Sequence, residues 1–443
     1  MREALPAEIL AGVEQLGEGL AQWAQAHPDA PLADQEEAVL GHVRAVLPTL
    51  LGAMLRLSVR RLRSPEASWP QPCPMCGQRA PVQSWRPRQV LTICGVLRFE
   101  RPWYVCRACP QGFSPVDATL ALPSQARLSP GLQARVVELG AKLSFREAVG
   151  TLKRLTGLVV APETVRQHTE AVGAELEQAH QVAMAAVPQT REPAAPVDPA
   201  PGRLLIEADG VMVRYGDDWH EVKLGLVGGQ VAGKLVAPSY VAARARVDRF
   251  GPRLLAEAAR RGALDVVAWD GAVTRRRLAV LREVVVLGDG AVWIWNLAAD
   301  HFGERIEILD FYHASEHIWT LAKACYGDGT AKAKRWAERQ CRRLRDRGPG
   351  PLLRVLRTIQ PRPPELAKLW RREGGYFRTN AARMAYPDFH QQGLPIGSGA
   401  VEAEAKRLVQ QRMKLPGARW SDAGAQAVLN VRCRLLSTLP ITA

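Results

Sequence analysis

The spacing of hydrophobic residues changes several times along this chain and divides it into five segments. Residues 1–65 carry apolar side chains at helical intervals, so we expect helices there. Residues 66–120 alternate apolar and polar positions between proline and cysteine residues, which is typical of short strands. Residues 121–185 return to helical spacing, and the Pro- and Ala-rich residues 186–202 predict a linker. Residues 203–435 begin with strand-like runs and end in helices, which predicts an α/β domain.

The order of elements in this last segment is informative. Three strand-like runs occupy residues 204–213, 221–226 and 235–240. A helix then leads to an apolar run at 284–290, and a second helix leads to a strand at 306–313. This βββ-α-β-α-β order is the ribonuclease-H-like order, in which the first and fourth strands lie side by side. We therefore expect an α/β multidomain protein with a ribonuclease-H-like core.

Carboxylates occupy the two strands that this order brings together. Asp209 lies on the first strand, and Asp289 lies at the end of the fourth. Asp270 competes for the second position, because it also follows an apolar run and precedes a glycine. We favour Asp289, because a helix and the strand that carries Asp310 follow it directly. Asp209 and Asp289 both precede a glycine, so each could also be a simple turn residue.

A third carboxylate follows the turn Ile396–Gly399. Glu402 lies in the first turn of the next predicted helix, in line with Lys406 and Val409, whereas Glu404 points about 200° away. A glutamate also simply favours a helix N-terminus. Three converging carboxylates repel one another and need cations, and hard oxygen ligands suit two Mg²⁺ or Mn²⁺ ions. Such a pair, ~4 Å apart, supports in-line attack on a phosphodiester.

Four cysteines predict a zinc site. Cys73, Cys76, Cys106 and Cys109 form two CxxC pairs that flank alternating runs at 90–93 and 96–99. This layout is that of a zinc ribbon with a structural, fully coordinated Zn²⁺. A redox CxxC pair is the alternative, and Cys94 is interpreted as a packed thiol. The neighbouring arginines suggest that the ribbon touches DNA; they are Arg86, Arg88, Arg98 and Arg101.

A helix-turn-helix is predicted after the ribbon. Ser144 and Glu147 form a capping box, and this helix ends near Gly157. A second helix opens at 161–168 and would present DNA-binding side chains, namely Thr164, Arg166 and Gln167. An ordinary helical hairpin fits the pattern nearly as well.

Charge favours a nucleic-acid partner. The 443 residues carry a formal charge of +15, and residues 332–372 hold 14 basic and three acidic residues, which is +11 of it. A solvated helical face is the alternative. We expect no membrane span, because no stretch approaches ~20 apolar residues. Without a signal-like N-terminus or a secreted disulfide pattern, the chain is expected in a bacterial cytoplasm, associated with the nucleoid.

At these residues the chain resembles DDE transposases of bacterial insertion sequences, of the ISKra type related to Mutator-like elements. The resemblance covers about residues 66–435 and rests on five motifs: Ala208–Gly210, Gly288–Ala291 with Trp293, Leu309–His313, Ile396–Glu402 and Lys406–Trp420. It implies Asp209, Asp289 and Glu402 as the metal-binding triad, and a basic helical insertion at about 314–392.

The resemblance also implies further site residues. Lys406, Arg412 and Lys414 are expected to contact DNA. His313 is expected near the catalytic site, although a buried histidine is about as common. Asp310 could support the metal ligands.

The expected function is therefore transposition. The ribbon and the helix-turn-helix would bind double-stranded terminal repeats, and the core would cleave DNA and join it to a target, working as at least a homodimer. A structure-selective nuclease of the same fold is one alternative. A catalytically dead DNA-binding regulator is another, and the complete Asp, Asp, Glu set speaks against it.

Overall fold

The structure is a computed structural model. It describes residues 7–59, 69–109, 111–187, 202–215, 218–231, 233–262, 265–269, 275–280, 283–359 and 361–438. The chain forms two compact units, Met1–His168 and Thr169–Ala443, which we call the N-terminal and C-terminal units. Most of the predicted linker, at 188–201, and Asp270 lie outside the described residues.

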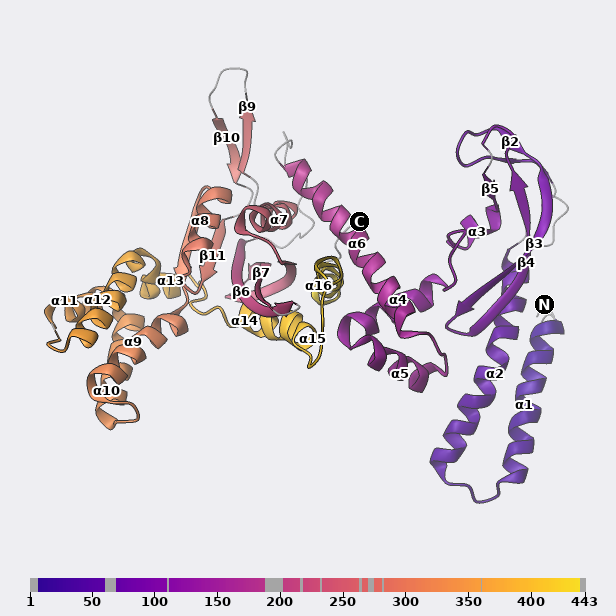
Figure 1. Cartoon of the computed structure of the whole chain (residues 1–443), viewed down its shortest axis with the longest axis horizontal. Coiled ribbons are helices and arrows are strands. Elements are labelled where there is room, and N and C mark those ends of the chain that lie inside the picture. The colour runs from indigo at the N-terminus through magenta and orange to yellow at the C-terminus, as the bar shows by residue number, and fades with distance from the viewer. Residues whose placement is uncertain are drawn as a thin grey trace. The chain divides into compact units, whose positions relative to one another are not determined.

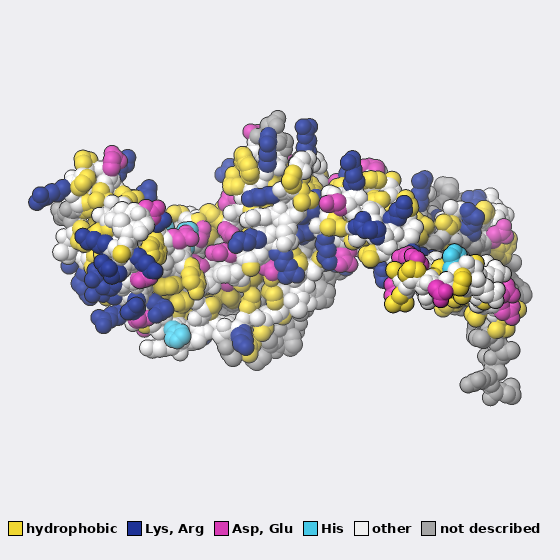
Figure 2. Space-filling view, turned by 90° about the horizontal axis from the view of Figure 1, so that it is seen from below, with side chains coloured by type: hydrophobic (Ala, Val, Ile, Leu, Met, Phe, Trp, Pro, Cys, Tyr) yellow, Lys and Arg dark blue, Asp and Glu magenta, His cyan; other side chains and the backbone are white. Residues whose placement is uncertain are grey.

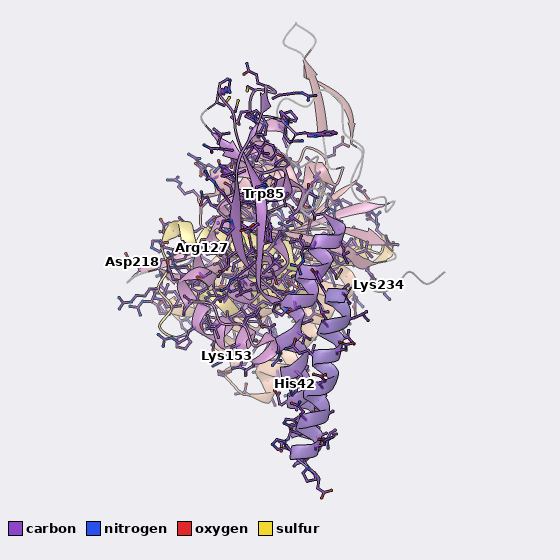
Figure 3. The ribbon with its side chains drawn as sticks, turned by 90° about the vertical axis from the view of Figure 1, so that its right-hand side faces the viewer. His42, Trp85, Arg127, Lys153, Asp218 and Lys234 are labelled. Carbon is purple, nitrogen blue, oxygen red and sulfur yellow. The ribbon has the colours of Figure 1, made fainter. Side chains whose placement is uncertain are left out.

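The N-terminal unit begins with two helices that lie side by side, as Figures 1 and 3 show. They are α1 (Ala7–Ala26) and α2 (Leu32–Ser58), the latter marked by His42 in Figure 3. By length and composition alone α2 could cross a membrane, contrary to the expectation of no such stretch. This is weak evidence, since a soluble helix can pass the same test. The C-terminal turn of α2 packs Leu55 against the apolar face of the following strands.

A small β-structure follows. Its strands are β1 (Gln71–Pro72), β2 (Arg79–Ala80), β3 (Val82–Thr92), β4 (Gly95–Val105) and β5 (Gly112–Phe113). β3 and β4 form one long antiparallel hairpin, on which Figure 3 labels Trp85. The runs predicted at 90–93 and 96–99 are the turn end of this hairpin. The two strands are longer than their apolar alternation, because the hairpin continues through arginine-rich sequence that backbone pairing and arginine contacts support.

Four helices complete this region: α3 (Pro115–Thr119), α4 (Pro130–Lys142), α5 (Phe145–Thr156) and α6 (Pro162–Ala186). The predicted capping box at the start of α5 is confirmed, because Ser144 and Glu147 each bond the other's backbone N–H. Gly157 ends α5 with φ 75°, a left-handed conformation that glycine adopts without a steric penalty. Leu132, Leu152 and Val165 pack α4, α5 and α6 around one apolar cluster.

The boundary between the two units falls inside α6 rather than in the predicted linker. The second half of α6 packs on α16 (Asp422–Leu436). Buried Asn430 of α16 donates to the Gly173 carbonyl and the Glu177 carboxylate, and Glu177 also pairs with Arg253. This polar network assigns residues 169–187 to the C-terminal unit, a division that helical periodicity does not reveal.

The C-terminal unit contains a mixed five-stranded sheet. Its strands are β6 (Arg203–Tyr215), β7 (Asp218–Val231), β8 (Lys234–Ala243), β11 (Val284–Gly288) and β12 (Arg305–Leu309). The order is β12-β11-β6-β7-β8; β6, β7 and β8 are antiparallel neighbours, while β11 runs parallel to β6 and to β12. The predicted first and fourth strands therefore do lie side by side. β9 (Asp265–Trp269) and β10 (Arg275–Val280) form a separate pair.

Helices surround and extend this sheet. Those that follow its strands are α7 (Val247–Arg260), α8 (Val292–His301) and α9 (Phe311–Tyr326). In Figure 1 a helical group extends from the β11 side of the sheet. With α9 it comprises α10 (Ala331–Arg347), α11 (Gly350–Thr358), α12 (Pro364–Thr379), η4 (Ala381–Met384) and α13 (Tyr386–Gln391). The chain then returns to the sheet as α14 (Gly399–Glu404), the π-helical η5 (Ala405–Gln410) and α15 (Gln411–Met413).

Candidate functional site

The three predicted carboxylates come from three elements of the C-terminal unit. Asp209 lies on β6, Asp289 directly follows β11, and Glu402 lies in the first turn of α14. In the parallel pairing of β6 with β11, Glu207 faces Leu287, so two residues further on Asp209 comes level with Asp289. The parallel ladder thus brings together two acids that are distant in sequence.

The charges of Asp289 and Glu402 act on Asp209. Burial, together with the charges of Asp289 and Glu402, raises the pKa of Asp209 to about 6. Within the part of the chain that the structure describes, none of the three forms an ion pair. Among the described residues, the three carboxylates do not form a tight ligand group like that of the four cysteines. Their oxygens nevertheless suit hard cations such as Mg²⁺. Because no described Lys or Arg side chain pairs with the three carboxylates, metal ions would have to balance their charge.

Two buried acids that the sequence analysis did not select as ligands hold α14 in place. Glu207, only 1% exposed, accepts a hydrogen bond of 2.9 Å from the Val401 N–H. Burial raises the pKa of Glu207 to about 8. Asp310 accepts hydrogen bonds from the backbone N–H and the hydroxyl of Ser398. Together these contacts fasten the turn before Glu402 to the sheet.

A hydrogen bond from the helical group also positions the carboxylate site. The Tyr376 hydroxyl on α12 donates to the Asp289 carbonyl at 3.2 Å. The ring of His317 stacks on Tyr376 with a centroid distance of 3.8 Å, and its Nδ1 lies 2.5 Å from a carboxylate oxygen of Glu373. No sequence motif marks Tyr376, because its role depends on how α12 folds back onto the sheet.

His313 lies in the first turn of α9, and its backbone N–H bonds the Asp310 carboxylate. Its ring is half-buried, packs edge-on to His317, and lies 3.6 Å from Glu316. The structure therefore connects His313 to the carboxylates through Asp310. His317, one turn later, is more firmly bonded and was missed by the sequence analysis.

The four predicted zinc ligands come together in the N-terminal unit. The Sγ atoms of Cys73, Cys76, Cys106 and Cys109 all lie within 4.8 Å of one another, so the group could hold a metal such as zinc. The 3.6 Å between Cys76 and Cys106 is close to the ~3.8 Å that tetrahedral Zn–S bonds require. The backbone N–H of Cys109 lowers the pKa of Cys106 to about 7, which favours the metal-binding thiolate. Cys94 lies in the hairpin turn, outside this cluster.

Two of the arginines expected to touch DNA are used inside the N-terminal unit. Arg101 is buried and pairs with buried Asp117 at 2.7 Å. Arg88 donates to the carbonyls of the loop that contains Pro123 and Ala126. These contacts stabilise the hairpin and leave Arg86 and Arg98 as its more exposed arginines.

The predicted recognition residues lie on the first turns of α6. Thr164 is half-buried and Gln167 is exposed. Arg166 pairs with Glu163 at 2.5 Å, and Gln167 also donates to Glu163. Glu163 would therefore have to release Arg166 before that guanidinium could contact a phosphate.

The three basic residues expected around α15 differ in exposure. Lys406 and Lys414 are exposed, as a DNA contact requires. Arg412 is only 3% exposed and its guanidinium lies 4.7 Å from the centre of the Trp420 ring. We correct the expectation for Arg412: its position is a packing position, because the helix turns it toward the loop that follows.

The basic residues at 332–372 form an exposed surface on the helical group. Figure 2 shows Lys and Arg side chains gathered over this end of the C-terminal unit. A cavity of about 560 Å³ beside α10 is lined by four cations, one glutamate and two aromatic residues. The cations follow one helix face; they are Lys332, Arg335, Arg339 and Arg342.

Comparison with known proteins links part of the chain to a family. Residues 77–227 match the model described as Uncharacterised protein family (UPF0236). The "UPF0236 protein in vanSb 3′region" of Streptococcus gallolyticus is 29% identical over 171 residues, which cover 36% of this chain and 35% of the relative. The chain thus matches about a third of that relative's length. The family match includes Asp209 and ends before Asp289 and Glu402.

Proposed function

We propose that this chain is a DDE-type transposase with a ribonuclease-H-like catalytic core. The observation that carries the proposal is the electrostatic coupling of Asp209 with Asp289 and Glu402, which come from β6, the end of β11 and α14. The sheet order supports it, because three antiparallel strands followed by two parallel ones are what this core requires. The cysteine cluster and the basic helical group fit a protein that handles DNA.

The proposed chemistry assigns distinct tasks to the residues. Asp209, Asp289 and Glu402 would hold two Mg²⁺ ions, which supply charge stabilisation for in-line displacement at phosphorus. Glu207 and Asp310 position Glu402 by fixing α14 to the sheet, and Tyr376 positions Asp289. The ribbon and α5–α6 would bind the terminal repeats of double-stranded DNA.

Cleavage of DNA that carries the ends of the encoding element tests the proposal. The wild-type chain should cut such DNA with Mg²⁺ or Mn²⁺ and join the 3′ ends to a target. Asp289→Asn should abolish both steps, whereas Asp300→Asn, at an exposed position on α8, should leave them intact.

The other outcomes separate the alternatives. Cleavage without joined products indicates a nuclease of the same fold. Binding to the ends without cleavage indicates a regulator. If the Asp289→Asn variant still cleaves DNA, Asp289 is not a metal ligand, and Asp270 becomes the next candidate for the second carboxylate.

A further inference from the structure

A second groove in the C-terminal unit lies between the β6–β7 hairpin and the loop after α15. Its volume is about 520 Å³. The lining residues are Arg214, Trp219, Met413, Lys414, Leu415, Pro416, Gly417, Ala418 and Arg419. None of them is acidic, so the groove combines an apolar lining with positive charge.

The groove combines an exposed aromatic ring with several cations. Trp219 is 59% exposed, although tryptophan is usually well buried. Arg214 faces it directly across the β6–β7 ladder, and exposed Lys414 and Arg419 lie on the opposite wall. An exposed aromatic ring among cations suits a base that stacks and phosphates that pair with the cations.

The groove is connected to the carboxylates by two rigid elements. β6 runs from Asp209 to Arg214, about 17 Å at 3.3 Å per residue. The continuous helix α14–η5–α15 runs from Glu402 to Met413 over a similar length, about 17 Å. Both elements meet at the acidic end, where Val401 bonds Glu207, and again at the groove. The length between the carboxylates and the groove corresponds to about five base pairs of DNA.

We propose that this groove binds the DNA strand about five base pairs from the scissile phosphate, with Trp219 stacking on an unpaired base. Arg214, Lys414 and Arg419 then contact the phosphates on either side of that base. The assignment of the strand rests on the proposed function, because it takes the carboxylates as the cleavage site. Binding itself requires neither metal nor cleavage.

Binding measurements on the full-length protein in EDTA test the groove. The probes are a mixed-sequence duplex with a single-stranded 3′ overhang and the same duplex with blunt ends, because stacking on an aromatic ring tolerates any base. Trp219→Ala should weaken overhang binding about tenfold with little effect on blunt DNA, and Trp219→Phe should retain most of it. Val231→Ala is the control, since this exposed apolar side chain lies at the other end of β7.

Salt dependence tests the cations. Lys414→Ala should lower the slope of log Kd against log salt by about 0.7 for the overhang probe, whose single-stranded part the groove binds. Lys234→Ala should leave it unchanged. Lys234 is also exposed, but it begins β8, just after the end of β7 that lies away from Trp219. Figure 3 shows Lys234 on the opposite side from Asp218, the residue next to Trp219.

Equal overhang binding by Trp219→Ala and wild type would overturn the proposal, as would an equal loss on both probes. The test of the groove is also independent of the test of DNA cleavage. A protein that never cuts DNA but needs Trp219 for overhang binding keeps the groove and loses the transposase assignment. A protein that cuts DNA without any need for Trp219 does the reverse.

Discussion

Gly173 allows α6 and α16 to approach each other more closely than any side chain would permit. A Cβ atom at this position would lie 2.2 Å from the Ala427 carbonyl oxygen and 2.5 Å from two further backbone atoms of α16. Ordinary contacts begin near 3.4 Å, so Gly173→Ala must push the two helices apart by about 1 Å. The neighbouring bonds from Asn430 to the Gly173 carbonyl and to Glu177 would lengthen with them.

The net effect follows from opposing contributions. Alanine favours a helix over glycine by about 1 kcal/mol, whereas overpacking costs about 1–3 kcal/mol and each weakened hydrogen bond about 1 kcal/mol. We therefore expect Gly173→Ala to destabilise the α6–α16 contact by about 2 kcal/mol. Gly41 in α2 is the matched control, because nothing lies within 4 Å of its position, and Gly41→Ala should stabilise α2 by about 0.5–1 kcal/mol.

Hydrogen exchange followed by mass spectrometry measures both effects in the intact protein, because it reports local opening separately for each peptide. Amides of residues 169–187 and 422–436 should exchange about 30-fold faster in Gly173→Ala, while those of α2 stay unchanged. If exchange in these peptides is unchanged or slower, the close backbone contact is not a constraint and the reasoning fails.

Three further predictions concern the metal site, the catalytic support and pH. Wild-type protein should contain one zinc by mass spectrometry, Cys106→Ser should lose it, and Cys94→Ser should keep it; zinc retained by Cys106→Ser would contradict the site. Tyr376→Phe should lower kcat of cleavage about fivefold without changing KM, because one hydrogen bond worth about 1 kcal/mol to the Asp289 carbonyl is lost. Burial lowers the pKa of His180 from 6.5 to about 4, so its contribution to stability is complete above pH 6.5 and is lost as pH falls toward 4. His180→Gln should remove about 3 kcal/mol of this acid sensitivity in urea unfolding, and an unchanged pH profile would refute it.

Local signals in the sequence predicted their structures well. The capping box of α5 depends on two residues three apart, and the cysteine cluster depends on two CxxC turns, so short-range pattern is sufficient for both. The pairing of β6 with β11 was also predicted, because the order of strands and helices restricts which strands can be neighbours.

Features that depend on tertiary packing were not predicted. The 1% exposure of Glu207 follows from the helix that covers it, and the burial of Arg412 follows from the path of the loop to Trp420. Neither residue differs in local sequence from an exposed charge. The division of α6 between two units likewise depends on α16, more than 240 residues later.

The arrangement of acids implies a conflict between stability and activity at Asp289. Glu207 and Asp310 hold the turn before Glu402 against the sheet. The pKa of Asp209 is raised mainly by burial, and the like charges of Asp289 and Glu402 contribute to the rise. Removing one charge should relieve this repulsion, so Asp289→Asn should stabilise the metal-free protein by about 1 kcal/mol while it abolishes cleavage.

Thermal unfolding with and without Mg²⁺ tests this argument. In EDTA the Asp289→Asn variant should melt at a higher temperature than wild type. Mg²⁺ should raise the Tm of wild type, because it binds the folded carboxylates, and should raise that of the variant much less. Asp300→Asn provides the control, since this exposed acid lies on α8, outside the carboxylate group. Equal stabilisation of Asp289→Asn and wild type by Mg²⁺ would show that Asp289 does not bind the ion. A Tm in EDTA no higher than that of wild type would show that Asp289 does not repel its neighbours.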